Sequence, residues 1–151
     1  MADKYASAGK RFLAILVDTI ILLIIMLVIA IPFGLSSLMM NAVTDYTGSS
    51  LMQFTNFAMW GVYMAIVFII GLAYFTYFEG KSGQTPGKKA LGIKVVGVDG
   101  KAIDYTDAFI RTILRIIDGI AFYIVGFIFI IATEKSQRLG DLAAKTVVVK
   151  A

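Results

Sequence analysis

The sequence predicts an α-helical membrane protein. It would have two long transmembrane helices, a third apolar helical segment that is either a short span or re-entrant, and a small cytoplasmic β-hairpin that a C-terminal strand can join. Three observations predict this class: an apolar composition, two long runs with almost no charge, and a basic, glycine-rich segment after the second run. Of 151 residues, 59% are hydrophobic and 16% charged, against about 45–50% and about 25% in soluble domains. At this length we expect one domain, residues 1–151.

The first span is expected at about residues 12–34. Residues 13–31 are apolar except for Asp18 and Thr19, and about 20 apolar residues suffice to cross a bilayer. A cleaved signal peptide is the alternative, but its apolar region would be about 7–15 residues long and would end at small residues. The observed run is longer, contains an Asp and ends at Pro32, which favours a retained helix.

A polar connection, residues 36–55, is expected to lead to the second span at about residues 55–78. This second run contains no charged residue, and aromatic side chains gather at both of its ends. Tyr and Trp collect at the two interfaces of a bilayer, so this distribution supports a second crossing.

The basic segment that follows predicts a β-hairpin at residues 92–104. Residues 93–98 are β-rich, and Asp99-Gly100 favours a two-residue hairpin turn. A return strand would then occupy residues 101–104. A lone hairpin is marginal in water, and residues 146–149 of the tail (Thr-Val-Val-Val) offer a third strand.

The distribution of Lys and Arg predicts the topology. The N-terminal lead, the hairpin segment and the tail (residues 133–151) are basic, whereas residues 36–55 contain no Lys or Arg. Cytoplasmic loops carry the excess of basic residues. We therefore expect a multi-pass protein of the cell (inner) membrane with a cytoplasmic N-terminus.

The third apolar segment, residues 107–132, has two interpretations. It is either an interfacial helix followed by a short span, with the tail outside, or a re-entrant hairpin that turns near Gly119 or Gly126 and returns the tail to the cytoplasm. Non-helical backbone at membrane depth requires cover by protein or water. The basic tail and its candidate strand favour the re-entrant alternative.

Two apolar runs each carry an Arg followed seven residues later by an Asp: Arg11 with Asp18, and Arg111 with Asp118. A charge at membrane depth is unfavourable unless it is paired or hydrated, so we expect a polar site inside the membrane. Seven residues separate the members of each pair by about 10 Å along one helix face. Pairing should therefore run between helices.

The expected arrangement places Asp18 against Arg111 or Arg115, and Asp118 against Arg11. Arg115 and Asp118 lie three residues apart and can also touch, and Arg11 can extend to lipid headgroups. These five residues form the candidate site. A structural ion-pair network and a functional polar site both stay open as its role.

The composition excludes several kinds of site. The chain has no Cys and no His, which excludes disulfides, Cys/His metal centres and catalysis by a Cys nucleophile or a His base. The glycines and lysines of residues 80–89 do not have phosphate-loop spacing. No cofactor, bound metal or enzymatic activity is therefore expected.

The net charge of +4 is compatible with nucleic acid, but the basic residues gather beside the apolar runs. The anionic surface of the lipid bilayer is therefore the expected partner, and no nucleic-acid partner is expected. Lys81, Lys88 and Lys89 are candidate contacts to lipid headgroups or to a protein partner.

The ordered motifs of the chain resemble those of the RDD family of prokaryotic membrane proteins. They are Arg11 with Asp18, TPGK at 85–88, GIKVV at 92–96, Asp99-Gly100, RTILRIID at 111–118 and QRLGDLAAKTVVV at 137–149. The resemblance covers nearly the whole chain and implies a small integral membrane protein usually drawn with three transmembrane regions. One departure is Lys145, where Gly often stands before Thr-Val-Val-Val.

By this resemblance, the arginine that names the family is Arg11 and the first aspartate is Asp18. The second is Asp118, with Asp141 as the alternative, because Arg138 and Asp141 also belong to a family-like motif. Transport roles, including cation/proton antiport, have been proposed for some members of the family.

The leading functional hypothesis is a transporter, or a transport component, for an ion or small solute. Asp18 and Asp118 would exchange charge with a cation or proton. A chain with two or three spans encloses little, so a homo-oligomer is expected. The alternative is a non-transporting scaffold whose basic loop and hairpin bind a protein partner or anionic lipid.

Overall fold

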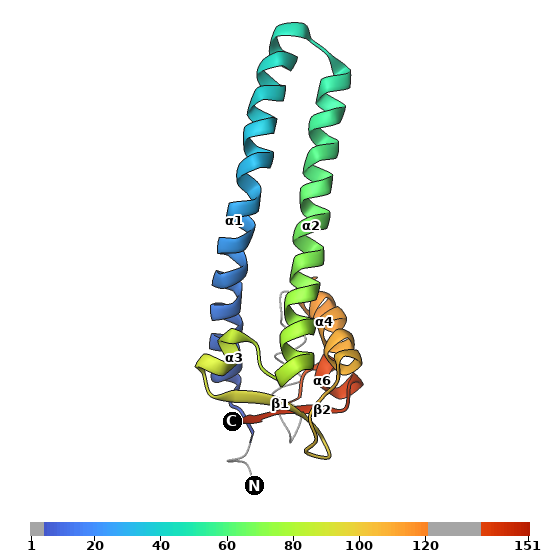
Figure 1. The fold of residues 1–151 in the computed structure, drawn as a ribbon. Helices are drawn as coiled ribbons and strands as arrows, with labels where there is room; N and C mark the ends of the chain where they lie inside the picture. Colours follow the sequence, from blue (N-terminus) through green and yellow to red (C-terminus); the bar gives the residue numbers. More distant parts are fainter. Residues whose placement is uncertain (1–4, 121–136) are drawn as a thin grey trace. The chain divides into compact units, whose positions relative to one another are not determined.

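The computed structural model describes residues 5–120 and 137–151. In that part of the chain the elements are, in order, α1 (Ala8–Thr47), α2 (Ser50–Ser82), α3 (Pro86–Ala90), β1 (Ile93–Gly97), α4 (Tyr105–Ile120), α6 (Leu139–Ala143) and β2 (Thr146–Lys150) (Figure 1). The chain divides into two compact units. Ile20–Gly71 forms the helical unit, and Met1–Thr19 with Leu72–Ala151 forms the mixed unit.

The first two helices are long and apolar enough to cross a membrane. Only 17% of the most apolar window of α1 and 6% of that of α2 is buried inside the protein. A core helix of a soluble protein would be mostly buried. The exposed apolar surface of α1 and α2 agrees with the two predicted spans, although both helices extend beyond the predicted bounds.

The polar connection predicted at residues 36–55 is wrong, because most of that segment is helical and only Gly48 and Ser49 separate α1 from α2. Its hydroxyl side chains bond to the carbonyl one turn earlier, as Thr44 does to Met40 at 2.8 Å and Thr55 to Leu51 at 2.9 Å. A hydroxyl that is satisfied in this way does not end a helix. The polar composition of residues 36–55 therefore predicted a loop where the chain is mostly helical.

The helical unit is held by a few contacts between its two helices. The side-chain amide of Asn56 donates to Asn41 Oδ1 at 2.7 Å. The ring of Tyr63 in α2 packs against the ring of Phe33 in α1, with centroids 5.4 Å apart, and against Trp60 of its own helix at 5.5 Å. These contacts define how the two helices pair within this unit.

The mixed unit contains a two-stranded antiparallel sheet formed by β1 and β2. In its register, Ile93 lies opposite Lys150 and Gly97 lies opposite Thr146. The chain turns at Asp99-Gly100, where Gly100 has a φ of 84°, but the loop has three residues instead of the predicted two, because Gly97 N donates to Lys101 O at 2.9 Å and Gly100 N to Gly97 O at 2.8 Å. The predicted return strand at residues 101–104 is wrong. The tail strand takes that role and pairs with β1 directly, because three consecutive valines form a better strand than residues 101–104.

The N-terminal segment also reaches this sheet. Ala6 N donates to Val148 O at 2.9 Å, and Tyr5 forms an isolated antiparallel bridge with Val149. The start, the middle and the end of the chain therefore meet at one sheet.

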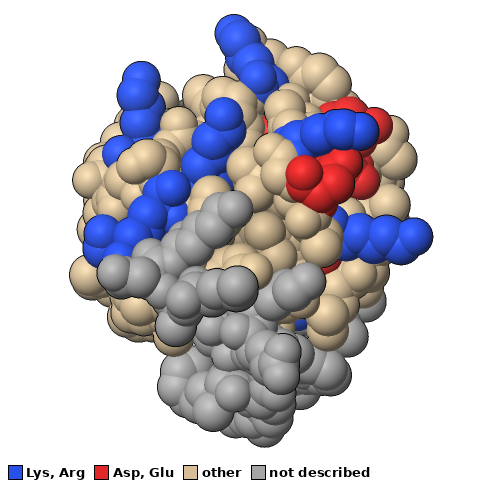
Figure 2. Space-filling model, turned by 90° about the horizontal axis from the view of Figure 1, so that it is seen from below, with Lys and Arg blue, Asp and Glu red and all other residues tan. Residues whose placement is uncertain are grey.

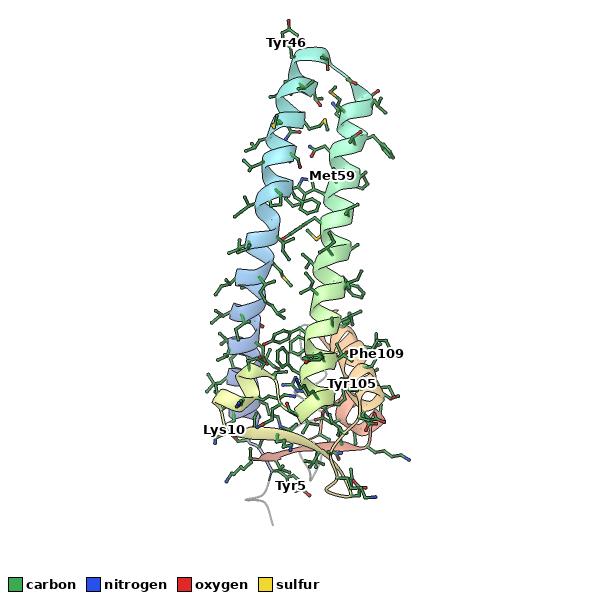
Figure 3. The ribbon with its side chains drawn as sticks, viewed as in Figure 1. Tyr5, Lys10, Tyr46, Met59, Tyr105 and Phe109 are labelled. Atoms are coloured by element: carbon green, nitrogen blue, oxygen red, sulfur yellow. The ribbon has the colours of Figure 1, made fainter. Side chains whose placement is uncertain are left out.

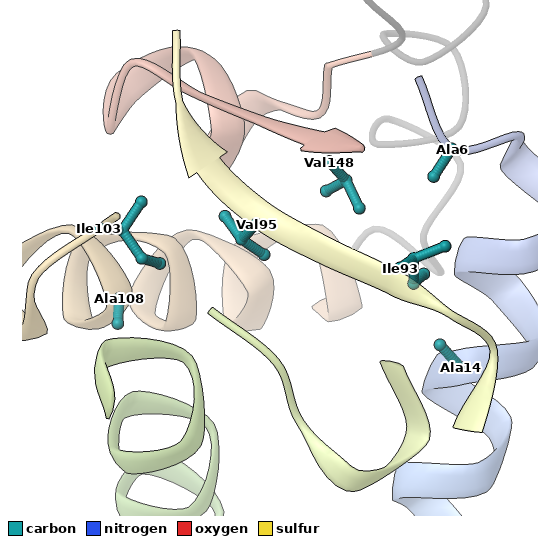
Figure 4. Close-up of a cluster of buried hydrophobic side chains, with 7 residues drawn as sticks. All are labelled: Ala6, Ala14, Ile93, Val95, Ile103, Ala108 and Val148. Carbon is teal, nitrogen blue, oxygen red and sulfur yellow. The ribbon is translucent and has the colours of Figure 1, made fainter. Parts of the chain in front are cut away.

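A small apolar cluster lies on the sheet between the helices (Figure 4). Ile93, Val95 and Val148 come from the strands, Ala6 and Ala14 from the N-terminal part, and Ile103 and Ala108 from around the start of α4. Small alanines allow the backbones to approach closely. The charged residues described below surround this limited core.

The third apolar segment is described only in part. Its first half is helical and forms α4, and its residues 121–132 lie outside the described residues. The outer side of α4 is apolar and exposed, with Tyr105, Phe109, Ile110 and Ile113, while Arg111 and Thr112 are buried. Figure 3 marks Tyr105 and Phe109 on this helix.

Candidate functional site

Asp18 accepts hydrogen bonds only from neutral donors among the described residues. Tyr74 Oη donates to Asp18 Oδ1 at 2.9 Å, Gly87 N donates to the same oxygen at 2.8 Å, and Thr85 Oγ1 donates to Oδ2. The carboxylate is 1% exposed. The predicted pairing of Asp18 with Arg111 or Arg115 is therefore wrong, because three hydrogen bonds satisfy the buried charge in place of a cation.

The turn that supplies these donors is formed by the TPGK motif. Thr85 caps α3: its hydroxyl accepts from Lys88 N at 3.2 Å and donates to Asp18. Pro86 occupies the first turn of the helix, where its missing N–H is no loss. A Cβ added at Gly87 would collide with Ala14 O and with the Asp18 carboxylate. Glycine is needed here because α3 lies directly on the backbone of α1.

Glu79, at the end of α2, is surrounded by three cations. Its Oε1 accepts from Lys88 Nζ at 2.9 Å and from Arg115 Nη2 at 2.6 Å, and its Oε2 accepts from Arg111 Nε at 3.0 Å. The side chain is 0% exposed. Elements far apart in sequence, α2, α3 and α4, are thus joined at a single carboxylate.

Asp141, in α6, is the second centre of the network. Its Oδ2 accepts from Arg11 Nη1 at 2.9 Å and from Arg138 N at 3.1 Å, and Arg111 Nη1 donates to its Oδ1 and to Thr146 Oγ1. Arg111 therefore bridges Glu79 and Asp141. Arg11 links α1 to α6 and also donates to two backbone carbonyls, Ala6 O at 3.3 Å and Val148 O at 3.4 Å.

The charges of this network perturb one another. Burial alone would raise the pKa of the Asp141 carboxyl, but Arg111 and Arg11 outweigh it and the pKa lies below its ordinary value. Burial, together with repulsion from Arg111 and Arg115, outweighs the attraction of Glu79 and lowers the pKa of Lys88 to about 8.

The predicted site residues meet only in part. Arg11, Arg111 and Arg115 belong to one ion-pair network, whereas Asp18 has its own hydrogen-bond partners. Arg11 is 4% exposed and bonded within the protein, so its expected reach to lipid headgroups is wrong. Asp118 lies in α4, but its side chain is outside the described residues, and its expected contact with Arg11 is therefore outside them too.

The second family-like motif enters the network through Asp141 and through the backbone N–H of Arg138. Of the three candidate headgroup lysines, Lys81 and Lys89 are exposed. Lys88 is buried against Glu79, so its predicted exposure to headgroups is wrong. A lysine that follows a glycine-rich turn is usually solvated, and only the fold brings Glu79 to it.

Glu79, Tyr74 and Thr85 were missed as site residues. Glu79 directly follows an apolar run, and this position predicted the first residue of a loop. The TPGK motif was available as a signal, because a Thr-Pro pair followed by Gly is typical of a capped helix start that approaches another backbone closely.

A small pocket that opens partly to solvent adjoins the network. The charged residues that line it in the described part of the chain are Arg11, Lys88, Arg111, Arg115, Arg138 and Asp141. No group of three or more Asp or Glu side chains suited to a metal ion is found in residues 5–120 and 137–151. The lining has an excess of positive charge, so its chemistry is that of an anion-attracting surface.

Comparisons with known proteins agree with the motifs. The model of the RDD family matches residues 5–145. "Uncharacterized protein YxaI" of Bacillus subtilis (strain 168) is 32% identical over 151 residues, which cover 97% of this chain and 98% of that protein. No solved structure matches the chain. The match along almost its whole length shows that this chain belongs to the RDD family.

Proposed function

We propose that the chain is an integral protein of the cell membrane in which α1 and α2 each cross the bilayer. The exposed apolar surface of both helices supports this proposal, because large apolar faces are stable in contact with lipid tails and unfavourable in water. The helices have 40 and 33 residues, and about 20 suffice for the hydrocarbon core.

The contacts of the sheet support one topology. The N-terminal segment, β1 and β2 are hydrogen-bonded together, and an odd number of crossings between α4 and β2 would separate the paired strands. We therefore favour the re-entrant alternative for residues 107–132. All three segments carry basic residues, which supports a cytoplasmic location for them.

The outer face of α4 is suited to contact with lipid in either interpretation of residues 107–132. Its exposed side chains are apolar or aromatic (Tyr105, Phe109, Ile110, Ile113), while its buried side carries Arg111. This is the inverse of a helix on a soluble core. It suits a helix that lies in the membrane interface with its apolar side toward lipid.

Cysteine labelling tests the topology, since the chain has no native Cys. Lys89→Cys and Lys150→Cys should react with a membrane-impermeant reagent from the cytoplasmic side, and Tyr46→Cys, at a position that is 94% exposed, from the opposite side. Equal labelling of Lys150→Cys and Tyr46→Cys from one side would contradict the proposal.

We further propose that the chain acts as a transport component for an ion or small solute, as a homo-oligomer. The observation that carries this proposal is the charge imbalance of the buried network: among the described residues, four cations (Arg11, Lys88, Arg111, Arg115) bond to two carboxylates, Glu79 and Asp141. A network that only locks helices together is most stable when its charges balance. An excess of one sign beside a pocket is typical of a site that receives a charged solute.

Flux into proteoliposomes tests transport. We expect flux of an ion or small solute with the unchanged protein and loss of this flux in Arg115→Gln. Lys81→Gln is the control, because Lys81 is exposed and bonds to Tyr77. Equal flux in folded Arg115→Gln and the unchanged protein would refute the proposal. Cross-linking in the membrane tests the oligomer.

The alternative function, a scaffold that binds anionic lipid or a protein partner, is favoured by the basic surface of the mixed unit. Figure 2 shows Lys and Arg side chains spread over one face, with the acidic side chains gathered in one place. Exposed lysines include Lys10, Lys81, Lys89, Lys101 and Lys145. Replacing Lys81 and Lys89 should abolish recruitment if this alternative holds, and should leave flux unchanged if it does not.

A further inference from the structure

Every carboxylate oxygen of the charged network accepts a hydrogen bond, whereas one of its buried donors has no acceptor among the described residues. Each oxygen of Glu79 and of Asp141 already accepts at least one hydrogen bond from a cationic side chain. Arg115 Nη1 is buried and has no hydrogen-bond partner among residues 5–120 and 137–151. A buried guanidinium nitrogen without an acceptor is unfavourable, and Arg115 also lines the pocket, which can receive an acceptor from outside the chain.

Arg115 is held in position for such a ligand. Its Nη2 donates to Glu79 at 2.6 Å, and the ring of Phe75 covers the guanidinium at 3.9 Å. Both contacts fix the plane of the group and leave the Nη1 edge without an acceptor. A fixed planar fork recognises the oxygens of phosphate or carboxylate better than a spherical ion does.

The charge of the pocket determines the sign of the ligand. Of the lining residues that the structure describes, five are basic and one, Asp141, is acidic. Even with Asp18 included, four bonded cations face three buried carboxylates in the described part of the chain. A metal cation or an ammonium group would be repelled, and an anion would balance the charge.

We propose that this pocket binds one oxyanion of the phosphate class, either free in solution or as the headgroup of an anionic phospholipid. The apolar side chains of Ile15 and Val148 also line the pocket and would exclude water from part of the bound group, which strengthens the charged hydrogen bonds. The inference rests on the proposed function, a solute-handling membrane protein, and names the class of solute.

Titration with inorganic phosphate tests the inference directly. The full chain is purified in a maltoside detergent, which contains no phosphate, and binding is measured by calorimetry. We expect saturable binding that weakens by at least about tenfold in Arg115→Gln and changes by less than about twofold in Lys89→Gln, the exposed control. Absence of phosphate binding, with no binding of phosphatidylglycerol either, would overturn the inference.

A second variant keeps the test valid if Arg115→Gln does not fold. Ile15→Glu places a carboxylate in the pocket itself, next to the excess positive charge, and should fold and block phosphate binding. Folded Ile15→Glu that binds phosphate as the unchanged protein does would refute the proposed location. Circular dichroism and gel filtration establish that each variant is folded.

A competition arm separates the two sources of the ligand. Phosphatidylglycerol added to the micelles should displace phosphate if the natural ligand is a lipid headgroup, and should leave the titration unchanged if it is a free anion. Phosphate binding without flux in proteoliposomes would support this inference and refute transport. Flux in a protein that binds neither phosphate nor phosphatidylglycerol would do the reverse.

Discussion

Removing the charge of Glu79 should destabilise the mixed unit more than any other single loss of charge in the chain. Glu79→Gln keeps the size of the side chain but removes the negative charge from a site that is 0% exposed and bonded to Lys88, Arg111 and Arg115. Arg111 would then keep Asp141, whereas Lys88 and Arg115 would have no bonded carboxylate among the described residues.

The magnitude follows from the geometry. Each charged hydrogen bond contributes about 1.5–3 kcal/mol, and an amide oxygen retains part of each. Leaving buried charge unpaired costs about 3–5 kcal/mol. We therefore expect the free energy of unfolding to fall by about 3–5 kcal/mol in Glu79→Gln.

The assay is unfolding in mixed detergent micelles, followed by far-ultraviolet circular dichroism. Asp45→Asn is the matched control because Asp45 is exposed in the helical unit. The double variant Glu79→Gln with Lys88→Met removes one carboxylate and one cation together. It should regain part of the loss, since the imbalance of charge is then no larger than in the unchanged protein.

A loss below about 1 kcal/mol in Glu79→Gln would refute this reasoning, because that is the range of a solvent-exposed ion pair. A double variant that is less stable than Glu79→Gln alone would also refute it, since it would show that Lys88 stabilises the fold without its carboxylate partner.

Three further predictions concern the turn that contains α3. Gly87→Ala should lower the free energy of unfolding by about 1–3 kcal/mol, because its Cβ would collide with Ala14 O. Its control is Gly9→Ala, in open space within α1, which should be neutral or stabilising. Equal effects of the two substitutions in the micelle assay would contradict the packing of α3 on α1. Thr85→Val should lower the free energy of unfolding by about 1–2 kcal/mol, because it removes the helix cap and the hydrogen bond to Asp18. Thr85→Ser keeps the hydroxyl and should not lower it, and the same assay compares the two variants. The pKa of Lys88 is about 8 in the folded protein and 10.5 as its ordinary value, so the unfolded chain holds more protons between those pH values and stability should rise as pH increases through that window. Measured against pH, this rise should disappear in Lys88→Met; a rise of equal size in that variant would assign it to another group.

The sequence predicted the parts of the fold that depend on local pattern. The apolar runs predicted α1 and α2, and the Asp99-Gly100 pair predicted a turn that the structure contains. The tail strand was predicted as a third strand and forms the direct partner of β1. Hydropathy and turn chemistry act over a few residues, so one sequence contains enough information for them.

The partners of the charges could not be predicted in the same way. Arg11 and Asp141 are 130 residues apart in sequence, and Asp141 stands in a polar tail where a solvated carboxylate is the ordinary expectation. Pairing was predicted between the two apolar runs because charges are least tolerable there. The fold instead brings Glu79 and Asp141, at the edges of apolar segments, to the arginines, and leaves Asp18 to three neutral donors.

This division predicts different consequences for two charges of the candidate site. Asp18→Asn should weaken the junction of α1 with α3, since Asn keeps one acceptor oxygen and brings an NH₂ group toward donors that need an acceptor. A loss of about 1–3 kcal/mol is expected, with phosphate binding retained in the folded fraction because no charge of the pocket changes. Arg115→Gln should show the opposite pattern, with a lost ligand and a smaller change in the α1–α3 junction. Calorimetry and unfolding, both measured on Asp18→Asn and on Arg115→Gln, distinguish loss of phosphate binding from loss of stability. If Asp18→Asn abolished binding in folded protein, Asp18 would belong to the binding site, and the separation of a structural carboxylate from an anion-binding network would be wrong.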